Sequence, residues 1–132
     1  ELEITDVNRH YLEEGTLRYS NAGQFPYPML FDGRTTRLLE SPGRPIGLFE
    51  DVEYRIRECG LPQECILVLV SDGILELMPE SELLKRYNKL LLYRHEMNLD
   101  PDKLASDLGV MAGRRLPDDI AFLVMSRCRG NE

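Results

Sequence analysis

The sequence predicts an α+β domain whose strands run largely antiparallel. Its patterns give one helix, roughly five strands, two helices and a last strand, so helices and strands come in separate groups. A parallel doubly wound fold would instead alternate a helix with each strand. The length of 132 residues suits one domain with one core rather than two. We therefore expect residues 1–132 to form a single domain with helices stacked on sheets.

The N-terminal third predicts a helix followed by three strands. Residues 1–14 carry apolar side chains at helical spacing with polar residues between them, which predicts a helix that ends near Gly15. The alternation in 16–23 predicts a strand that runs into a turn. Asp32–Gly33 is a typical hairpin turn, so we expect one strand before it and another after it.

The middle of the chain predicts a loop and then two strands that differ in burial. Proline and glycine recur in 41–51, which predicts a loop. The following segment, 52–59, alternates strictly, which predicts a half-buried strand. Alternate residues share one face of that strand: Val52, Tyr54, Ile56 and Glu58. The run 65–70 is continuously apolar and predicts a fully buried strand.

The C-terminal third predicts two helices and a second buried strand. Apolar residues recur at helical spacing over 81–97, which predicts a helix capped by Ser81. Asp100–Pro101 predicts the start of the next helix, because proline suits the first helical position. The apolar run from Ile120 to Met125 predicts another fully buried strand.

Composition and charge exclude several classes of function. The chain is 42% hydrophobic and 30% charged, which is ordinary for a globular protein, and no apolar run reaches the roughly 18 residues of a membrane span. A net charge of −7 without a basic stripe argues against a nucleic-acid partner. The N-terminal residues show no secretory signal, and the 3 cysteines lack metal-type spacing. A reduced, cytoplasmic setting is therefore expected.

Acidic residues stand at the ends of the two apolar runs. Asp72 and Gly73 follow the first run, and Asp118 and Asp119 precede the second. Carboxylates at the ends of two buried strands that meet would form a hard-oxygen site suited to Mg²⁺ or Mn²⁺. Each cluster alone also has a purely structural explanation, because Asp–Gly is a common turn and an acidic pair suits a solvated loop or a cap.

Other residues that could carry chemistry lack partners at suitable spacing. His10 and His95 have no second histidine or cysteine at ligand spacing, so we interpret them as surface or packing residues. Ser20 and Ser71 have no general base near them in the sequence, which argues against a nucleophilic serine. No catalytic side chain is therefore assigned.

Four motifs in order give the chain a family resemblance: LRYSNAGQFPYPMLF, PGRPIGLF, ILVLVSDGILEL and PDDIAFLVMS. The chain resembles the metal-dependent protein phosphatases (PPM family), and more closely the SpoIIE-type domains of bacterial response regulators and sigma-factor control proteins. The resemblance implies an antiparallel β-sandwich flanked by helices. It also implies hydrolysis of phosphoserine or phosphothreonine at a two-metal centre that uses Mn²⁺ or Mg²⁺.

The resemblance also assigns roles to particular residues. Asp72 and Asp118 match metal ligands of the family, and Asp119 is expected to lie just behind the metal site. Gly73 is expected to permit the shape of the turn. Gln24 departs from the family pattern, because it stands where the family often has a histidine that does not bind metal.

The family's first metal-binding motifs have no counterpart in these residues. The chain therefore resembles the C-terminal portion of such a domain, with an incomplete fold and only part of the two-metal site. The expected partner is a phosphorylated signalling protein or a regulator of the anti-sigma or anti-sigma-antagonist type, and a dimer stays open. Two rival hypotheses remain: an inactive, phosphatase-like adaptor that binds a sigma-factor regulator, and an unrelated α+β domain. In an adaptor, Phe25 and Tyr27 would be the first candidates for partner binding.

Overall fold

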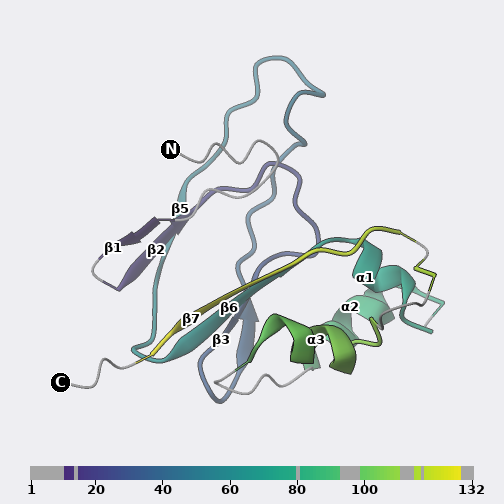
Figure 1. Cartoon of the computed structure of the whole chain (residues 1–132). Coiled ribbons are helices and arrows are strands. Elements are labelled where there is room, and N and C mark those ends of the chain that lie inside the picture. The colour runs from purple at the N-terminus through teal and green to yellow at the C-terminus, as the bar shows by residue number, and fades with distance from the viewer. Residues whose placement is uncertain are drawn as a thin grey trace.

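Two antiparallel sheets form the framework of the protein (Figure 1). The computed structural model describes residues 11–13, 15–79, 81–92, 99–110, 115–116 and 118–128. The smaller sheet has the order β1-β2-β5, with β1 at Tyr11–Glu13, β2 at Thr16–Tyr19 and β5 at Arg57–Gly60. The larger sheet has the order β4-β3-β6-β7, with β4 at Thr36–Leu38, β3 at Met29–Phe31, β6 at Cys65–Val70 and β7 at Phe122–Arg127.

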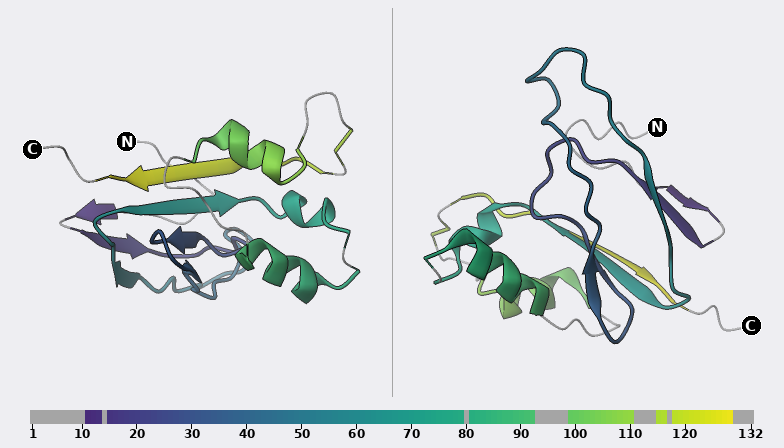
Figure 2. Two further views of the ribbon diagram at one scale, coloured as in Figure 1. Left: turned by 90° about the horizontal axis from the view of Figure 1, so that it is seen from below. Right: turned by 180° about the vertical axis from the view of Figure 1, so that it is seen from behind.

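In the described residues, three helices cover one face of the larger sheet. They are α1 (Gly73–Glu76), α2 (Leu83–Leu92) and α3 (Pro101–Asp107). Figures 1 and 2 show the helices on one side of β6 and β7, with the smaller sheet on the other side. The predicted fold class, an α+β antiparallel sandwich flanked by helices, is confirmed. Within the described part of the chain, no helix is long and apolar enough to cross a membrane.

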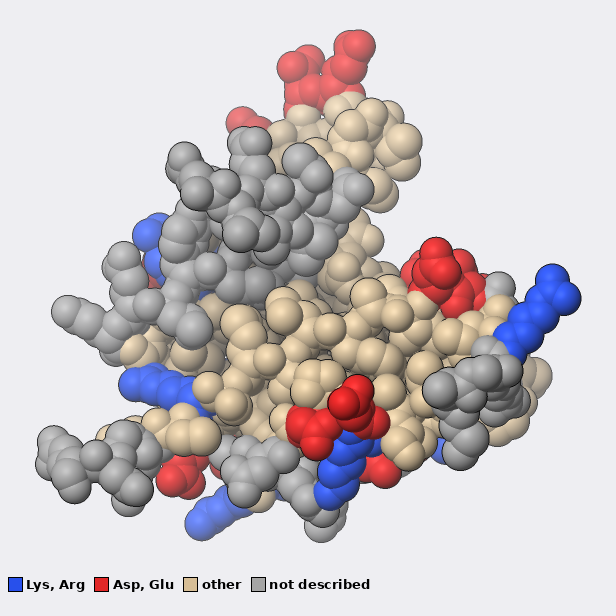
Figure 3. Space-filling view, viewed as in Figure 1, with Lys and Arg blue, Asp and Glu red and all other residues tan. Residues whose placement is uncertain are grey.

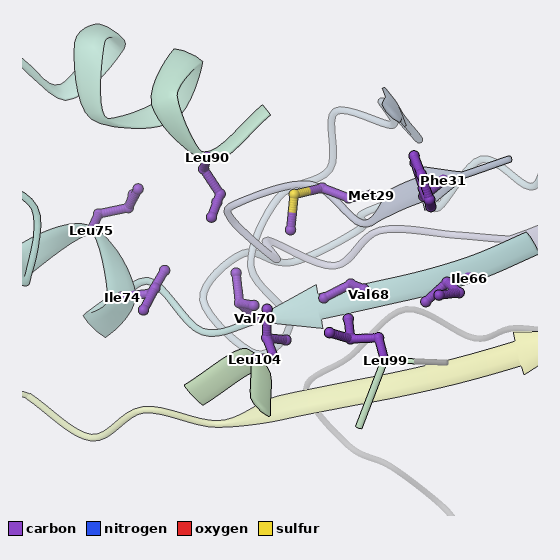
Figure 4. Packing of buried hydrophobic residues seen from close by; sticks show 10 residues of the cluster. All are labelled: Met29, Phe31, Ile66, Val68, Val70, Ile74, Leu75, Leu90, Leu99 and Leu104. Atoms are coloured by element: carbon purple, nitrogen blue, oxygen red, sulfur yellow. The ribbon is translucent and has the colours of Figure 1, made fainter. Parts of the chain in front are cut away.

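The central strand β6 contributes to two separate cores. Its side chains alternate between the two faces of the sheet, as expected for a strand. Ile66, Val68 and Val70 pack with the helices in the cluster drawn in Figure 4, which includes Leu90 and Leu104. The alternate residues of β6 pack against the smaller sheet: Cys65, Leu67 and Leu69. All six residues of β6 are buried, so the prediction for this strand is confirmed.

Local side-chain chemistry explains two further elements that the sequence predicts. In the β3–β4 hairpin, Asp32 Oδ1 accepts hydrogen bonds from the backbone N–H groups of Arg34 at 2.9 Å and Thr35 at 2.8 Å. At the start of α3, Asp100 Oδ1 accepts from Lys103 N at 2.9 Å, and proline occupies the first turn. The hairpin and this helix are therefore confirmed.

The helix predicted over residues 1–14 is wrong where the structure describes it. Tyr11–Glu13 form β1 and pair with β2, with Leu12 opposite Leu17. Gly15, with φ of 78°, lies in the turn between the two strands. Hairpin pairing therefore overrides the helical spacing of Tyr11 and Leu12. The rest of that prediction, His10 included, lies outside the described residues, as does His95.

The half-buried strand predicted over 52–59 is much shorter than expected. Strand β5 begins only at Arg57, because its partner β2 has four residues and ends opposite that position, at Tyr19. Ile56, expected on the inner face, is exposed. Residues 41–51 contain no helix or strand, as predicted, and the segment between β4 and β5 projects away from both sheets (Figures 1 and 2).

The last strand and the middle helix also differ from expectation. β7 pairs with β6 but is only partly buried, and Leu123 is 46% exposed. Helix α2 begins at Leu83 rather than after Ser81, and the Glu82 carbonyl accepts its first hydrogen bonds, from Lys85 N and Arg86 N. An apolar run does not reveal whether a strand lies inside a sheet or at its edge, which is why the burial of β7 was overestimated.

Candidate functional site

The ladder between β6 and β7 continues into the two acidic segments. Ser71 N donates to the Ala121 carbonyl at 3.0 Å. Ser71 Oγ accepts from Ala121 N at 2.9 Å and donates to the Asp119 carbonyl at 3.2 Å. The register pairs Val70 with Phe122, so Asp72 comes opposite Ile120, directly after Asp119. The two acidic strand ends therefore meet at one edge of the larger sheet.

Gly73 lies in close contact with the backbone of the second acidic segment. A Cβ atom at this position would lie 2.5 Å from the Asp119 carbonyl oxygen. The φ angle of Gly73 is not in the left-handed region, and the residue begins α1. Glycine at this position therefore permits the close approach of the two backbones without a left-handed conformation.

Replacing Gly73 by alanine is expected to push the two acidic segments apart. Because the Cβ would meet a backbone oxygen and not the end of a flexible side chain, we expect the chain to lose about 2 kcal/mol of unfolding free energy. Urea unfolding measures this loss. The matched control is Gly60→Ala, whose Cβ would meet no atom within 4 Å. Equal stability of the two variants would contradict the close packing at Gly73.

The carboxylates of the site are exposed to solvent. Asp72, Asp118 and Asp119 all have exposed side chains, and Figure 3 shows acidic side chains gathered over the start of α1. Asp72 makes no capping hydrogen bond to α1, whereas Asp118 Oδ1 accepts from Asp119 N at 2.8 Å. Among the residues that the structure describes, no group of three or more potential ligands surrounds a metal position. These carboxylates can therefore supply hard-oxygen ligands, but only part of a complete coordination shell.

The turn before β3 is fixed to the end of β6 by a residue whose role the sequence does not reveal. Gln24 Nε2 donates to the Val70 carbonyl at 2.8 Å, immediately before the acidic segment. The buried Asn21 shapes the turn, because its Oδ1 accepts from Gly23 N and Gln24 N, each at 2.7 Å. The only sequence signal for Gln24 is its place in the motif where the resembled family often has histidine.

An open pocket of about 270 Å³ adjoins the acidic edge. The turn, the projecting segment and the end of β6 all contribute to its lining: Ala22, Gly23, Gln24, Phe25, Pro45, Ile46, Leu48, Ser71 and Asp72. Of the two predicted partner-binding residues, Phe25 lines this pocket. Tyr27 is not part of the lining; it is half-buried, and its ring lies edge-on to that of Phe25 at a centroid distance of 6.1 Å.

Comparison with known sequences finds a family whose model covers most of the chain and a similar protein of known name. The sequence model of the family described as Stage II sporulation protein E (SpoIIE) matches residues 6–128. The phosphoserine phosphatase RsbP of Bacillus subtilis (strain 168) is 33% identical over 75 residues, which cover 57% of this chain and 17% of RsbP. The similarity to RsbP thus concerns a small part of that protein.

Comparison with solved structures finds the same fold. The phosphatase domain of the cell fate determinant SpoIIE from Bacillus subtilis, presoaked with Mn, has a TM-score of 0.64 at 16% identity, over 97% of this chain and 58% of that one. The RsbU and RsbW domains of Rv1364c from Mycobacterium tuberculosis give 0.65 at 20% identity, over 89% and 34%. The chain spans less than two thirds of each of these relatives.

Proposed function

The chain belongs to the Stage II sporulation protein E (SpoIIE) family, and from this premise we propose that it is part of a metal-dependent protein serine/threonine phosphatase domain. The observation that carries the proposal is the meeting of two acidic strand ends, held by the hydrogen bonds of Ser71 to Ala121 and Asp119. Family membership supports the proposed class of reaction, and this geometry supports the choice of residues.

In this proposal, Asp72 and Asp118 are the two metal ligands that this chain contributes. Both are exposed carboxylates at one sheet edge, a donor type that suits Mn²⁺ or Mg²⁺. A divalent ion bound there would make a water molecule more acidic and offset negative charge on the phosphoryl oxygens. Asp119 and Gly73 position the ligands, because the Asp119 carbonyl accepts from Ser71 and lies against Gly73.

The remaining ligands are proposed to come from outside these residues. A Mg²⁺ ion takes about six oxygen ligands, and two carboxylates with water complete only part of that set. The chain covers 58% of the solved SpoIIE phosphatase chain, which is compatible with these residues being the C-terminal portion of the domain. We use "parent polypeptide" for a longer protein that would contain them.

The proposed setting is bacterial signal transduction in the cytoplasm. The substrate would be a phosphorylated signalling protein, such as a regulator of the anti-sigma-antagonist type, and the similar protein RsbP is itself a phosphoserine phosphatase. Phe25 would contact this partner directly, and Tyr27 would support the Phe25 ring through their edge-on contact.

A phosphatase assay with two lengths of protein tests the proposal. The 132-residue chain alone should hydrolyse p-nitrophenyl phosphate poorly or not at all, since its carboxylates complete only part of a metal site. The parent polypeptide should hydrolyse it when Mn²⁺ or Mg²⁺ is added. Strong Mn²⁺-dependent turnover by the short chain would contradict the proposal that further metal ligands lie outside these residues. No turnover by the parent polypeptide would contradict the phosphatase function.

A further inference from the structure

Three exposed apolar side chains surround the pocket beside Asp72. Phe25 is 37% exposed, Ile46 is 47% exposed and Leu48 is 73% exposed, and all three line the same hollow. They come from two separate segments, the turn before β3 and the projecting segment between β4 and β5. A cluster of exposed apolar residues beside an acidic site marks a contact surface more often than scattered single residues do.

Hydrogen bonds and close packing hold the two walls of this pocket together. Ile46 N donates to the Ala22 carbonyl at 3.3 Å, which ties the projecting segment to the turn. A Cβ on Gly23 would lie 2.8 Å from Pro45 Cα, so the backbones approach closely there as well. Gln24 then joins the turn to the end of β6. The apolar walls are therefore placed in a fixed position relative to Asp72.

The side of the pocket formed by Phe25 also contacts helix α2. Its ring lies 5.2 Å from the ring of Tyr87 in α2, with planes tilted by 32°. Burial raises the pKa of Tyr87 to about 12, above an ordinary value that already leaves the phenol uncharged at physiological pH. Phe49 is exposed too but is not part of the pocket lining, and the Arg44 guanidinium lies 5.0 Å from its ring centroid.

We propose that this pocket binds one apolar side chain of the phosphoprotein substrate, located within about three residues of the phosphorylated serine or threonine. Three extended residues span roughly 10 Å, which is enough to reach from a phosphate at the acidic edge into the adjoining pocket. This inference rests on the proposed phosphatase function and adds the substrate feature that the site recognises.

Size and charge both favour an apolar side chain as the occupant. The open hollow of about 270 Å³ has room for a leucine-sized side chain, and it is smaller than the roughly 300–1,000 Å³ of a pocket for a whole small molecule. The chain carries a net charge of −7, which repels a phosphorylated partner and gives no help from long-range attraction. The exposed side chains of Phe25, Ile46 and Leu48 offer apolar contact for such an occupant, beside the polar part of the lining.

The test compares phosphoserine peptides that differ in one apolar residue. An alanine-based peptide is prepared with a single leucine at each position around the phosphoserine in turn, and kcat/KM is measured with the parent polypeptide. At one position leucine should raise kcat/KM about tenfold, mainly through KM, as burial of one leucine side chain allows. In Leu48→Ala and Ile46→Ala this preference should fall to about twofold or less.

Leu84→Ala is the matched control, since Leu84 is 73% exposed like Leu48 but lies in α2 and not in the pocket lining. It should keep the full preference.

If both pocket variants keep the preference while the wild type hydrolyses p-nitrophenyl phosphate, the pocket inference is wrong and the phosphatase proposal stands. If the wild type has no turnover, the phosphatase proposal fails. Peptide binding measured by fluorescence anisotropy then tests the pocket inference, which equal binding of leucine and alanine peptides would overturn. Loss of self-association in Leu48→Ala with an unchanged preference would also overturn it, in favour of an interface between copies.

Discussion

Replacing Asp72 or Asp118 by asparagine is expected to lower phosphopeptide hydrolysis by the parent polypeptide more than about 100-fold, because even groups that only support metal ligands commonly contribute 10–100-fold. Each change keeps the size of the side chain and removes one negative charge from the acidic edge. The fold should survive, and without metal the unfolding free energy should stay the same or rise, because neighbouring carboxylates repel one another. Turnover at saturating Mn²⁺ and thermal unfolding measure the two effects.

The matched control for these changes is Glu64→Gln, which removes the same charge from an exposed residue just before β6, at the opposite end of that strand from Asp72. It should leave turnover within about twofold, since surface charge changes away from a site have small effects. Binding of a partner protein measured on the same variants separates enzyme from adaptor. Unchanged turnover in both aspartate variants would contradict the phosphatase function, and an adaptor would keep its partner affinity in both.

Replacing Gly43 by alanine is expected to cause the largest loss of stability, about 3 kcal/mol. The new Cβ would clash with the backbone oxygen of Asn21, so either the loop or the turn must move. Asn21 is buried and shapes the turn that carries Gln24 and Phe25, which leaves little freedom to adjust. The midpoint of urea unfolding of the chain measures the loss.

Gly60→Ala again serves as the control, and its stability should stay within about 0.5 kcal/mol of the wild type. If Gly43→Ala were as stable as this control, the loop over 41–51 would not pack on the turn as described. The contact between Gly43 and Asn21 would then no longer help to fix the pocket walls, and the hydrogen bond from Ile46 N to the Ala22 carbonyl would have to hold them without it.

The parts of the fold that the sequence predicts well are those determined by local chemistry or by complete burial. Strand β6 is apolar throughout and buried throughout, and α3 begins at an aspartate cap followed by proline. The parts predicted poorly depend on distant partners. Strand β5 is short because β2 is short, and Tyr11–Glu13 form a strand because β2 lies beside them. Periodicity within a segment carries no information about such partners.

Some residues of the candidate site can be predicted from the sequence, and others cannot. The acidic residues can be found from the sequence because each stands at the end of an apolar run, and the structure brings those two ends together. The roles of Gln24 and Ser71 cannot be found, because each acts through a hydrogen bond to a residue far along the chain: Val70 for Gln24, Asp119 and Ala121 for Ser71. Nor does the sequence show that Ile46 and Leu48 share a pocket with Asp72.

The antiparallel register of β6 and β7 limits how this protein can change in length. Pairing runs without interruption from Cys65 opposite Arg127 to Val70 opposite Phe122. One inserted or deleted residue in either strand would turn its later side chains to the opposite face, exchanging the residues of the two cores. Two inserted residues would keep the faces but shift one acidic end by roughly 7 Å relative to the other. Insertions that preserve the acidic edge are therefore confined to segments outside this strand pair, such as the projecting one between β4 and β5.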